Sequence, residues 1–360
     1  MNKTLKITLI SLGSLLGLIL LTVALVCWFV VTPARLTSIV RKQAPNFINC
    51  DFSIEKADLT VFKTFPKVGL KINDVVLVNP MVGSPSDTLA YIEECVVSVD
   101  VEKFLDENHI LIDECRLNGG YVNLFVDEHG SSNLDIFPPS KPDTDDESSE
   151  FTYAIDLALL KFNDVDVNYS DLSVGIIADI SGFNMAAKGK MKDNLLAGDM
   201  DLSMHELVYQ QLTDSLSMAV KLNNLKAEGE AEMLGDNVKA DIDVSSSDLL
   251  YESEGQIAGF KSLTFKYKGD VADYDKVNAN VELAVNDMSF VMDDEALVKE
   301  ADIRFISPLN ATLSTMDVDF GNSQIALNNM FIDFVGEASM PGDDIVVDLD
   351  LKTNTLIIKV

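Results

Sequence analysis

The chain has 360 residues, with 58 acidic and 27 basic side chains and a formal net charge of −31. No basic stripe interrupts this acidity. Nucleic acid and tightly held anionic headgroups are therefore disfavoured as partners, because clustered lysine and arginine bind phosphate groups. The acidity indicates a solvated outer surface.

The first predicted element is a transmembrane helix over residues 7–31. No residue from Ile7 to Ala34 is charged, and at about 1.5 Å per residue this helix exceeds a hydrocarbon core of about 30 Å. A cleaved signal peptide is the alternative, but its apolar core of about 7–15 residues ends in small residues. The chain has Trp28–Val31 at that place. We expect a retained single-pass anchor, with residues 1–6 as a cytoplasmic tail and an exported body.

Within the span, Gly13 and Gly17 have the GxxxG spacing that lets membrane helices approach closely. Alone this spacing is a weak signal, and incidental small residues are the alternative. The sequence therefore leaves the oligomeric state open.

After the span the chain is predicted to be mainly β. Pro33 at a helix start, with Leu36, Ile39 and Val40 on one side, predicts a short amphipathic helix to about Gln43. Strands are expected at about 50–61, 68–78, 89–101, 110–117 and 121–127, with one or two helical turns at 101–108. The Asn118-Gly119-Gly120 segment predicts a tight turn between the last two strands.

A proline-rich and then acidic segment at 138–150 separates a β region at 32–137 from an antiparallel β region at 151–360. Its composition cannot bury apolar surface. A calcium loop from Asp143 would need glycine at position six and glutamate at position twelve, where Ser148 and Ala154 stand. We expect an exposed linker or loop.

Six successive strand patterns between Leu216 and Val285 place apolar residues on one side and polar residues on the other. Five segments carry them: 216–223, 225–233, 238–245, 263–268 and 277–286. The last segment is long enough to bend into two strands, which makes six. Each such strand has one apolar face and one polar, solvent-exposed face. Short turns predict an antiparallel meander, and no long helix follows Gln43 to cover the apolar face. Alternation continues to Val360, so we expect this region to be truncated at its C-terminus.

Motifs that carry chemistry are lacking. His109, His129 and His205 lie in unrelated segments, and no nucleophile elbow, phosphate loop or metalloprotease motif occurs. The cysteines lack metal-binding spacing, so we expect no catalytic residue, no cofactor, no metal site and no enzyme. Cys95 and Cys115 fall in neighbouring predicted strands. The sequence leaves two alternatives for them, a disulfide or two buried free thiols.

Several segments resemble the AsmA family of envelope proteins, in particular its Bacteroidetes-type members. Phe65–Val75 (FPKVGLKINDV) resembles the family's "fP…v.l.dv.l" segment, and Val99–Leu105 followed by Ile110, Ile112 and Leu117 resembles its next segment. Val122–Leu124 with Gly130 and Asn133 resembles its hairpin, and Asn322–Leu351 resembles its late strands.

The resemblance implies an inner-membrane anchor, a periplasmic β-body and kinship with bridge-like lipid transfer proteins, whose sheets form an apolar groove. It implies a role in phospholipid transport or outer-membrane biogenesis, with phospholipid or another acyl lipid, the inner membrane and outer-membrane assembly proteins as partners. We therefore expect a transmembrane helix followed by a curved, groove-like antiparallel sheet with one or two short helices. A closed β-sandwich serving as a scaffold for outer-membrane proteins is the alternative, because sandwich strands alternate in the same way.

The residues expected to line the groove are apolar members of the alternating strands. They are Val122, Leu124, Val126, Val165, Val167, Val220, Leu222, Val238, Ile242, Phe265, Val281, Leu283, Ile325, Leu327, Ile332, Phe334, Val347 and Leu349.

Overall fold

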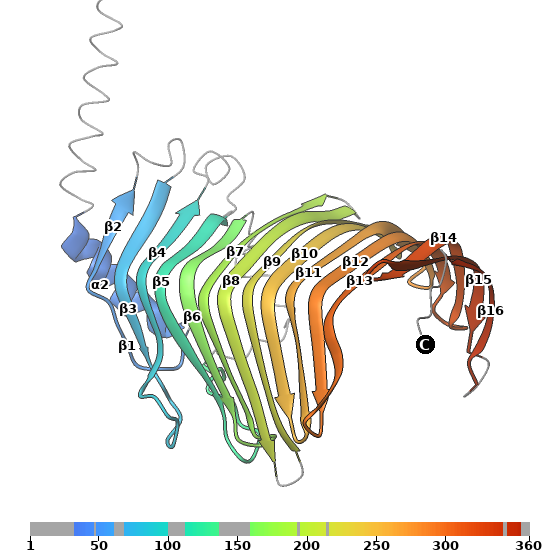
Figure 1. Cartoon of the computed structure of the whole chain (residues 1–360). Helices are drawn as coiled ribbons and strands as arrows, with labels where there is room; N and C mark the ends of the chain where they lie inside the picture. The colour runs from blue at the N-terminus through green and yellow to red at the C-terminus, as the bar shows by residue number, and fades with distance from the viewer. Residues whose placement is uncertain are drawn as a thin grey trace, which may run out of the picture.

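A computed structural model describes residues 32–46, 48–60, 68–99, 112–136, 159–192, 195–213, 216–340 and 344–353. The strands of these residues form one 16-stranded sheet, an open and curved layer in Figure 1. The predicted span at 7–31, the helical turns at 101–108, the linker at 138–150 and residues 354–360 lie outside the described residues. In the described ranges no helix has the length and apolar character to cross a membrane.

The elements begin with helix α2 (Pro33–Gln43), whose bounds match the prediction, and the 3₁₀ turn η1 (Ala44–Asn46). The strands are β1 (Phe52–Ser53), β2 (Lys56–Thr60), β3 (Val68–Val78), β4 (Thr88–Val99), β5 (Ile112–Val126), β6 (Leu159–Asp171), β7 (Ile176–Lys192), β8 (Leu195–Thr213), β9 (Leu216–Leu234), β10 (Asn237–Ser253), β11 (Gln256–Ala272), β12 (Lys276–Met292), β13 (Glu295–Thr312), β14 (Asp317–Leu327), β15 (Met330–Ser339) and β16 (Val346–Thr353).

From β3 to β16 the strands follow chain order across the sheet, while β1 and β2 both pair with β3. Each strand from β6 to β15 pairs antiparallel with the next. The predicted meander is wrong at one junction, because β5 and β6 run parallel, with Gly120 beside Val165. Parallel neighbours need a connection that returns along the whole strand, and in the sequence the connection between β5 and β6 is residues 127–158. The regions on either side of this connection share one sheet.

Two predicted strand breaks are wrong. β5 runs through the Asn118-Gly119-Gly120 segment, and β9 joins the two patterns at 216–223 and 225–233. In each strand the apolar alternation shifts by one residue beside a residue with positive φ, which is 62° at Gly119 and 50° at Asn224. Because pairing continues on both sides, the residue bends the strand without ending it.

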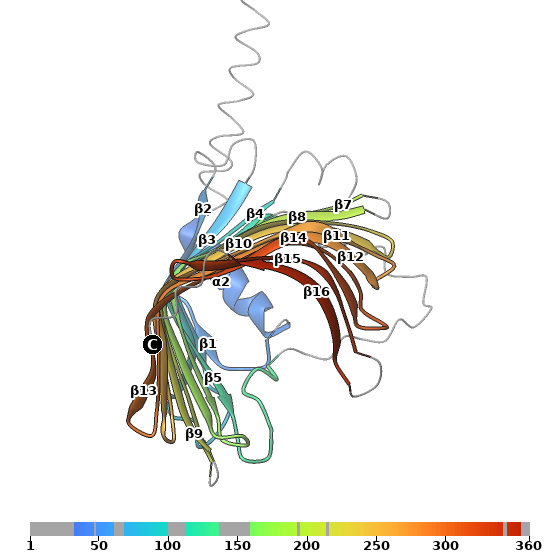
Figure 2. The same cartoon turned by 45° about the vertical axis from the view of Figure 1, so that its right-hand side comes forward.

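The same interruption recurs in eight strands and forms a crease across the sheet. The crease residues with positive φ are Asp74 (β3), Gly119 (β5), Asp164 (β6), Gly182 (β7), Asn224 (β9), Asp248 (β10), Asp287 (β12) and Glu300 (β13). Glycine, asparagine and aspartate tolerate this conformation better than other residues. The strands bend near their middle in Figure 1 and form two walls in Figure 2. We call the half-strands with Leu222 (β9) and Phe290 (β12) the lower wall, and those with Ala227 (β9) and Leu283 (β12) the upper wall.

Side chains next to the crease satisfy its backbone groups. The Asp164 N–H donates to Asn184 Oδ1 at 3.0 Å, and the Gly182 N–H donates to Asp166 Oδ1 at 2.9 Å. Asn184 and Asp166 therefore supply acceptors for backbone groups where β6 and β7 bend.

Helix α2 covers the N-terminal edge of the sheet. The Ala57 N–H of β2 donates to Thr37 Oγ1 at 2.8 Å, and Arg41 Nη2 donates to the Ile54 carbonyl at 2.7 Å. These side chains bind backbone groups that an edge strand would otherwise present for pairing, so the helix protects this edge from adding another strand.

Candidate functional site

One continuous row of apolar side chains crosses the upper wall. Residues that are direct partners in neighbouring strands share a face of the sheet. The row, from β2 to β15, is Ala57, Ile72, Cys95, Leu117, Phe162, Met185, Leu202, Ala227, Val244, Phe265, Leu283, Phe305, Ile325 and Ile332. At about 4.8 Å between strands, a row over fourteen strands extends for roughly 60 Å.

A second apolar row crosses the lower wall. From β1 to β11 it contains Phe52, Leu77, Ala90, Val122, Val167, Ile180, Leu207, Leu222, Leu249 and Phe260. On both sides of the crease the less exposed positions follow the apolar residues, as at Leu222 and Leu225 of β9. Both walls therefore turn their apolar residues to the same side.

Burial beside the crease shows that this side is the concave one. Val165 is 1% exposed, Ala301 5%, Ser246 7% and Met204 8%. In a single layer, solvent is excluded most strongly on the inside of a bend. The apolar face is therefore the inside of the fold, and we call it, with its two walls, the apolar trough.

Among the described residues, helix α2 is the one element that packs against a strand other than a neighbouring strand of the sheet, so no described element covers the trough beyond the β2 end. At the β14–β16 end, Ile325, Leu327 and Val347 are 42%, 43% and 54% exposed. The alternative of a closed β-sandwich is therefore wrong for the described part of the chain. Helix α2 covers the β2 end, where Ala57 is fully buried.

The sequence-predicted lining residues all lie on the apolar side by register or strand alternation. Those of the upper wall are Val238, Ile242, Phe265, Val281, Leu283, Ile325, Leu327, Ile332, Phe334, Val347 and Leu349, and those of the lower wall and crease are Val122, Leu124, Val126, Val165, Val167, Val220 and Leu222. The prediction left out other large residues of the upper row, namely Ile72, Leu117, Phe162, Met185, Leu202, Val244 and Phe305.

An aromatic cluster occupies the apolar side at β13–β15. The ring centroids of Phe305 and Phe334 lie 6.4 Å apart, and those of Phe320 and Phe334 lie 5.6 Å apart. Beside them the Ser307 and Ser323 hydroxyls share a hydrogen bond of 2.7 Å and are almost fully buried. Aromatic rings and a buried hydroxyl pair thus pack against one another on the apolar side of these three strands.

A family model for the AsmA family matches residues 1–189, more than half of the chain. The chain belongs to the AsmA family. Comparisons with curated proteins and with solved structures give no match. Membership in the AsmA family suggests a role in the cell envelope.

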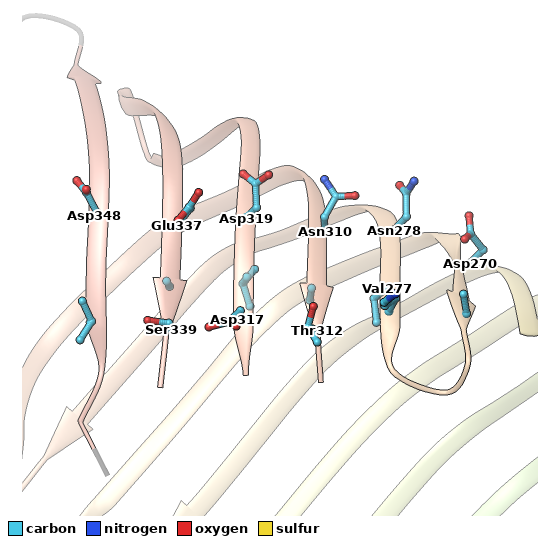
Figure 3. Close-up of a pocket in the computed structure, with 16 residues that line it drawn as sticks. Asp270, Val277, Asn278, Asn310, Thr312, Asp317, Asp319, Glu337, Ser339 and Asp348 are labelled. Carbon is cyan, nitrogen blue, oxygen red and sulfur yellow. The ribbon is translucent and has the colours of Figure 1, made fainter. Parts of the chain in front are cut away.

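The outer face of this AsmA-family sheet is polar. Near the rim of the upper wall, one row in register places Asp270, Asn278, Asn310, Asp319, Glu337 and Asp348 side by side around an open hollow (Figure 3). Among the described residues, no group of three or more His, Cys, Asp or Glu side chains is arranged to hold a metal ion. The row is spread along the sheet rather than converging on one point, and it has the character of a solvated surface.

One titratable pair lies at the crease of the sheet. The Tyr91 hydroxyl donates to Asp74 Oδ1 at 2.7 Å. This hydrogen bond raises the pKa of Tyr91 to about 12 and lowers the pKa of Asp74. Asp74 is itself a crease residue, so the pair links β3 to β4 where β3 bends.

Proposed function

We propose that this AsmA-family protein binds the acyl chains of lipids in the apolar trough and takes part in phospholipid transport or outer-membrane biogenesis. The observation that carries the proposal is the apolar row on the concave face, which no described element covers beyond the β2 end, where helix α2 packs. A soluble sheet with such a face needs something to cover it. In the proposed role, the covering partner is lipid rather than a second protein layer.

The dimensions and energetics of the trough support this role. Each CH₂ group that leaves water contributes about 0.8 kcal/mol, so one alkyl chain laid along the apolar row gains several kcal/mol. A bilayer core of about 30 Å contains two leaflets of about 15 Å each. A row of roughly 60 Å is therefore long enough for several chains in succession.

We propose that residues 7–31 anchor the protein in the inner membrane as a single span, with the N-terminus in the cytoplasm and the sheet in the periplasm. This arrangement follows from the uncharged N-terminal run and the acidic body after it. The proposed role includes no catalysis and no cofactor, and any lipid movement would be passive or driven by a partner protein.

Site-specific photocrosslinking in cells tests the proposal. A photoreactive residue replaces Phe265, on the trough lining, or its neighbour Lys266, on the outer face. We expect lipid adducts on the full chain at position 265 and few at position 266. Lipid bound to the membrane span is the same in both samples and does not affect the comparison. Protein adducts without lipid adducts at position 265 would instead support an assembly scaffold.

A further inference from the structure

Cys95 of β4 and Cys115 of β5 are neighbours on the apolar side of the upper wall. Cys95 is the direct partner of Leu117, and Cys115 is the direct partner of Val97, so the cysteines are related by a diagonal of the antiparallel pair. The twist of such a pair shortens one diagonal and lengthens the other. Both cysteines are free thiols in the structure. Each is the largest cause of the other's pKa shift, through a hydrogen bond between the thiols, which places the pair on the shorter diagonal.

The two thiols are chemically unequal. The hydrogen bond from Cys95 stabilises the Cys115 thiolate and lowers the pKa of Cys115 to about 7, despite partial burial. The same bond and burial raise the pKa of Cys95. A thiol with a pKa near 7 is substantially ionised at neutral pH, and the thiolate is the attacking species in thiol–disulfide exchange. Cys115 is therefore suited to attack first, with Cys95 beside it to complete the exchange.

Cys50 differs from this pair. Its pKa is raised by burial and by Asp51, and no thiol contributes to the shift. It lies just before β1, on the lower-wall side of the crease. Cys50 is therefore a matched control that has a thiol but lacks a neighbouring one.

We infer that Cys95 and Cys115 form a disulfide between β4 and β5 when the protein meets a disulfide-bearing oxidant. The Cys115 thiolate attacks one sulfur of the oxidant, which forms a mixed disulfide and releases one thiolate. The Cys95 thiol then loses its proton and attacks the Cys115 sulfur, which releases the second thiolate of the oxidant. The protein loses two electrons and two protons, and the oxidant is reduced to the dithiol level.

The bond would join two strands whose connection, residues 100–111, lies outside the described part of the chain. Cross-linking positions 95 and 115 closes a loop of about 20 residues, which restricts the unfolded chain and stabilises the folded one. This modification is independent of the proposed lipid binding. Both sulfur atoms belong to the trough lining in the thiol form and in the disulfide form, and the lining stays apolar in both.

The test uses the purified full chain, equilibrated with oxidised glutathione and then alkylated. We expect one disulfide-linked peptide that contains Cys95 and Cys115, a mass lower by about 2 Da than that of the reduced chain, and a Tm about 5 °C higher. Cys50→Ser should keep all three results, and Cys115→Ser should lose them. Alkylation of both cysteines after oxidation, or a disulfide through Cys50, would overturn the inference.

A kinetic measurement keeps the test independent of folding losses in the variants. In the reduced chain, the alkylation rate of Cys115 should rise with pH around a midpoint near 7. Cys95→Ala should move this midpoint upward, because the stabilising hydrogen bond is gone. An unchanged midpoint would contradict the thiol pairing on which the disulfide depends.

Discussion

Replacing Leu283 with aspartate should abolish most lipid binding by the trough. Leu283 lies in the middle of the upper apolar row, directly between Phe265 and Phe305. An ionised carboxylate at this place would have to lose water for an acyl chain to lie over it. We estimate that this raises the free energy of lipid binding by about 2–3 kcal/mol, which weakens affinity by roughly 30–150-fold.

The substitution should also lower protein stability, but to a smaller extent. Leu283 is only partly buried, so the lost apolar burial costs the folded state about 1 kcal/mol. Leu283→Asn separates the two effects, since it removes the apolar side chain without adding charge. We expect its lipid affinity to fall between those of the wild type and Leu283→Asp.

The assay is titration of the reconstituted full chain with a fluorescent fatty acid, followed by thermal unfolding of each variant. The matched control is Asn280→Asp, which adds the same carboxylate on the outer face, opposite Lys268. It should leave lipid affinity within about twofold of the wild type. Equal losses in Leu283→Asp and Asn280→Asp, or no loss in either, would refute the assignment of the concave face as the binding surface.

Three further predictions concern the fold. Gly182→Val should lower the Tm by several degrees in thermal unfolding, because φ of Gly182 is +60° and an added Cβ would lie 2.2 Å from a histidine nitrogen. In the control Gly189→Ala, an added Cβ meets no atom within 4 Å, and the Tm should not fall. Thr37→Ala should lower the free energy of unfolding by about 1–2 kcal/mol in denaturant unfolding, because the buried Ala57 N–H of β2 then loses its acceptor, Thr37 Oγ1. Asp74→Asn should return the pKa of Tyr91 from about 12 towards 10 in an ultraviolet titration. Since the pKa of Tyr91 is raised in the folded state, the stability from this hydrogen bond is complete below pH 10 and is lost as pH rises towards 12, and the variant should lack that loss.

The sequence predicted an element correctly where the pattern that specifies it lies within that element. The Pro33 start and the apolar spacing of α2 predict its observed bounds, and the apolar residues on both sides of Asp74 predict β3 at residues 68–78. The apolar face was also predictable, because alternation assigns each side chain to a face without knowledge of neighbouring strands.

The crease was not predictable in the same way. Between Leu222 and Leu225 the alternation shifts by one residue, and this shift is compatible with either a turn or a bend. The distinction depends on whether pairing continues with β8 and β10, which is a matter of register between strands. The alignment of crease residues across the sheet is likewise visible only once the strands are paired, as for Asp164, Asn224 and Asp287.

The open state of the trough also lies beyond the sequence pattern. Apolar alternation is the same whether a strand faces a second sheet or an open concavity. The parallel pairing of β5 with β6 depends on the connection between them, in which the acidic segment at 138–150 predicts only an exposed linker or loop. Both features are properties of how strands assemble, rather than of any one segment.

The two ends of the sheet are unlike. β13 pairs with β14 only from Ile303 to Thr312, so β14, β15 and β16 lengthen the upper wall alone. Within the described residues, the apolar side is flanked by two walls as far as β13 and by one wall from β14 to β16, and helix α2 packs beside β2 at the opposite end. The lining is therefore asymmetric along its length: its helix-covered end has two walls, and its β14–β16 end has one.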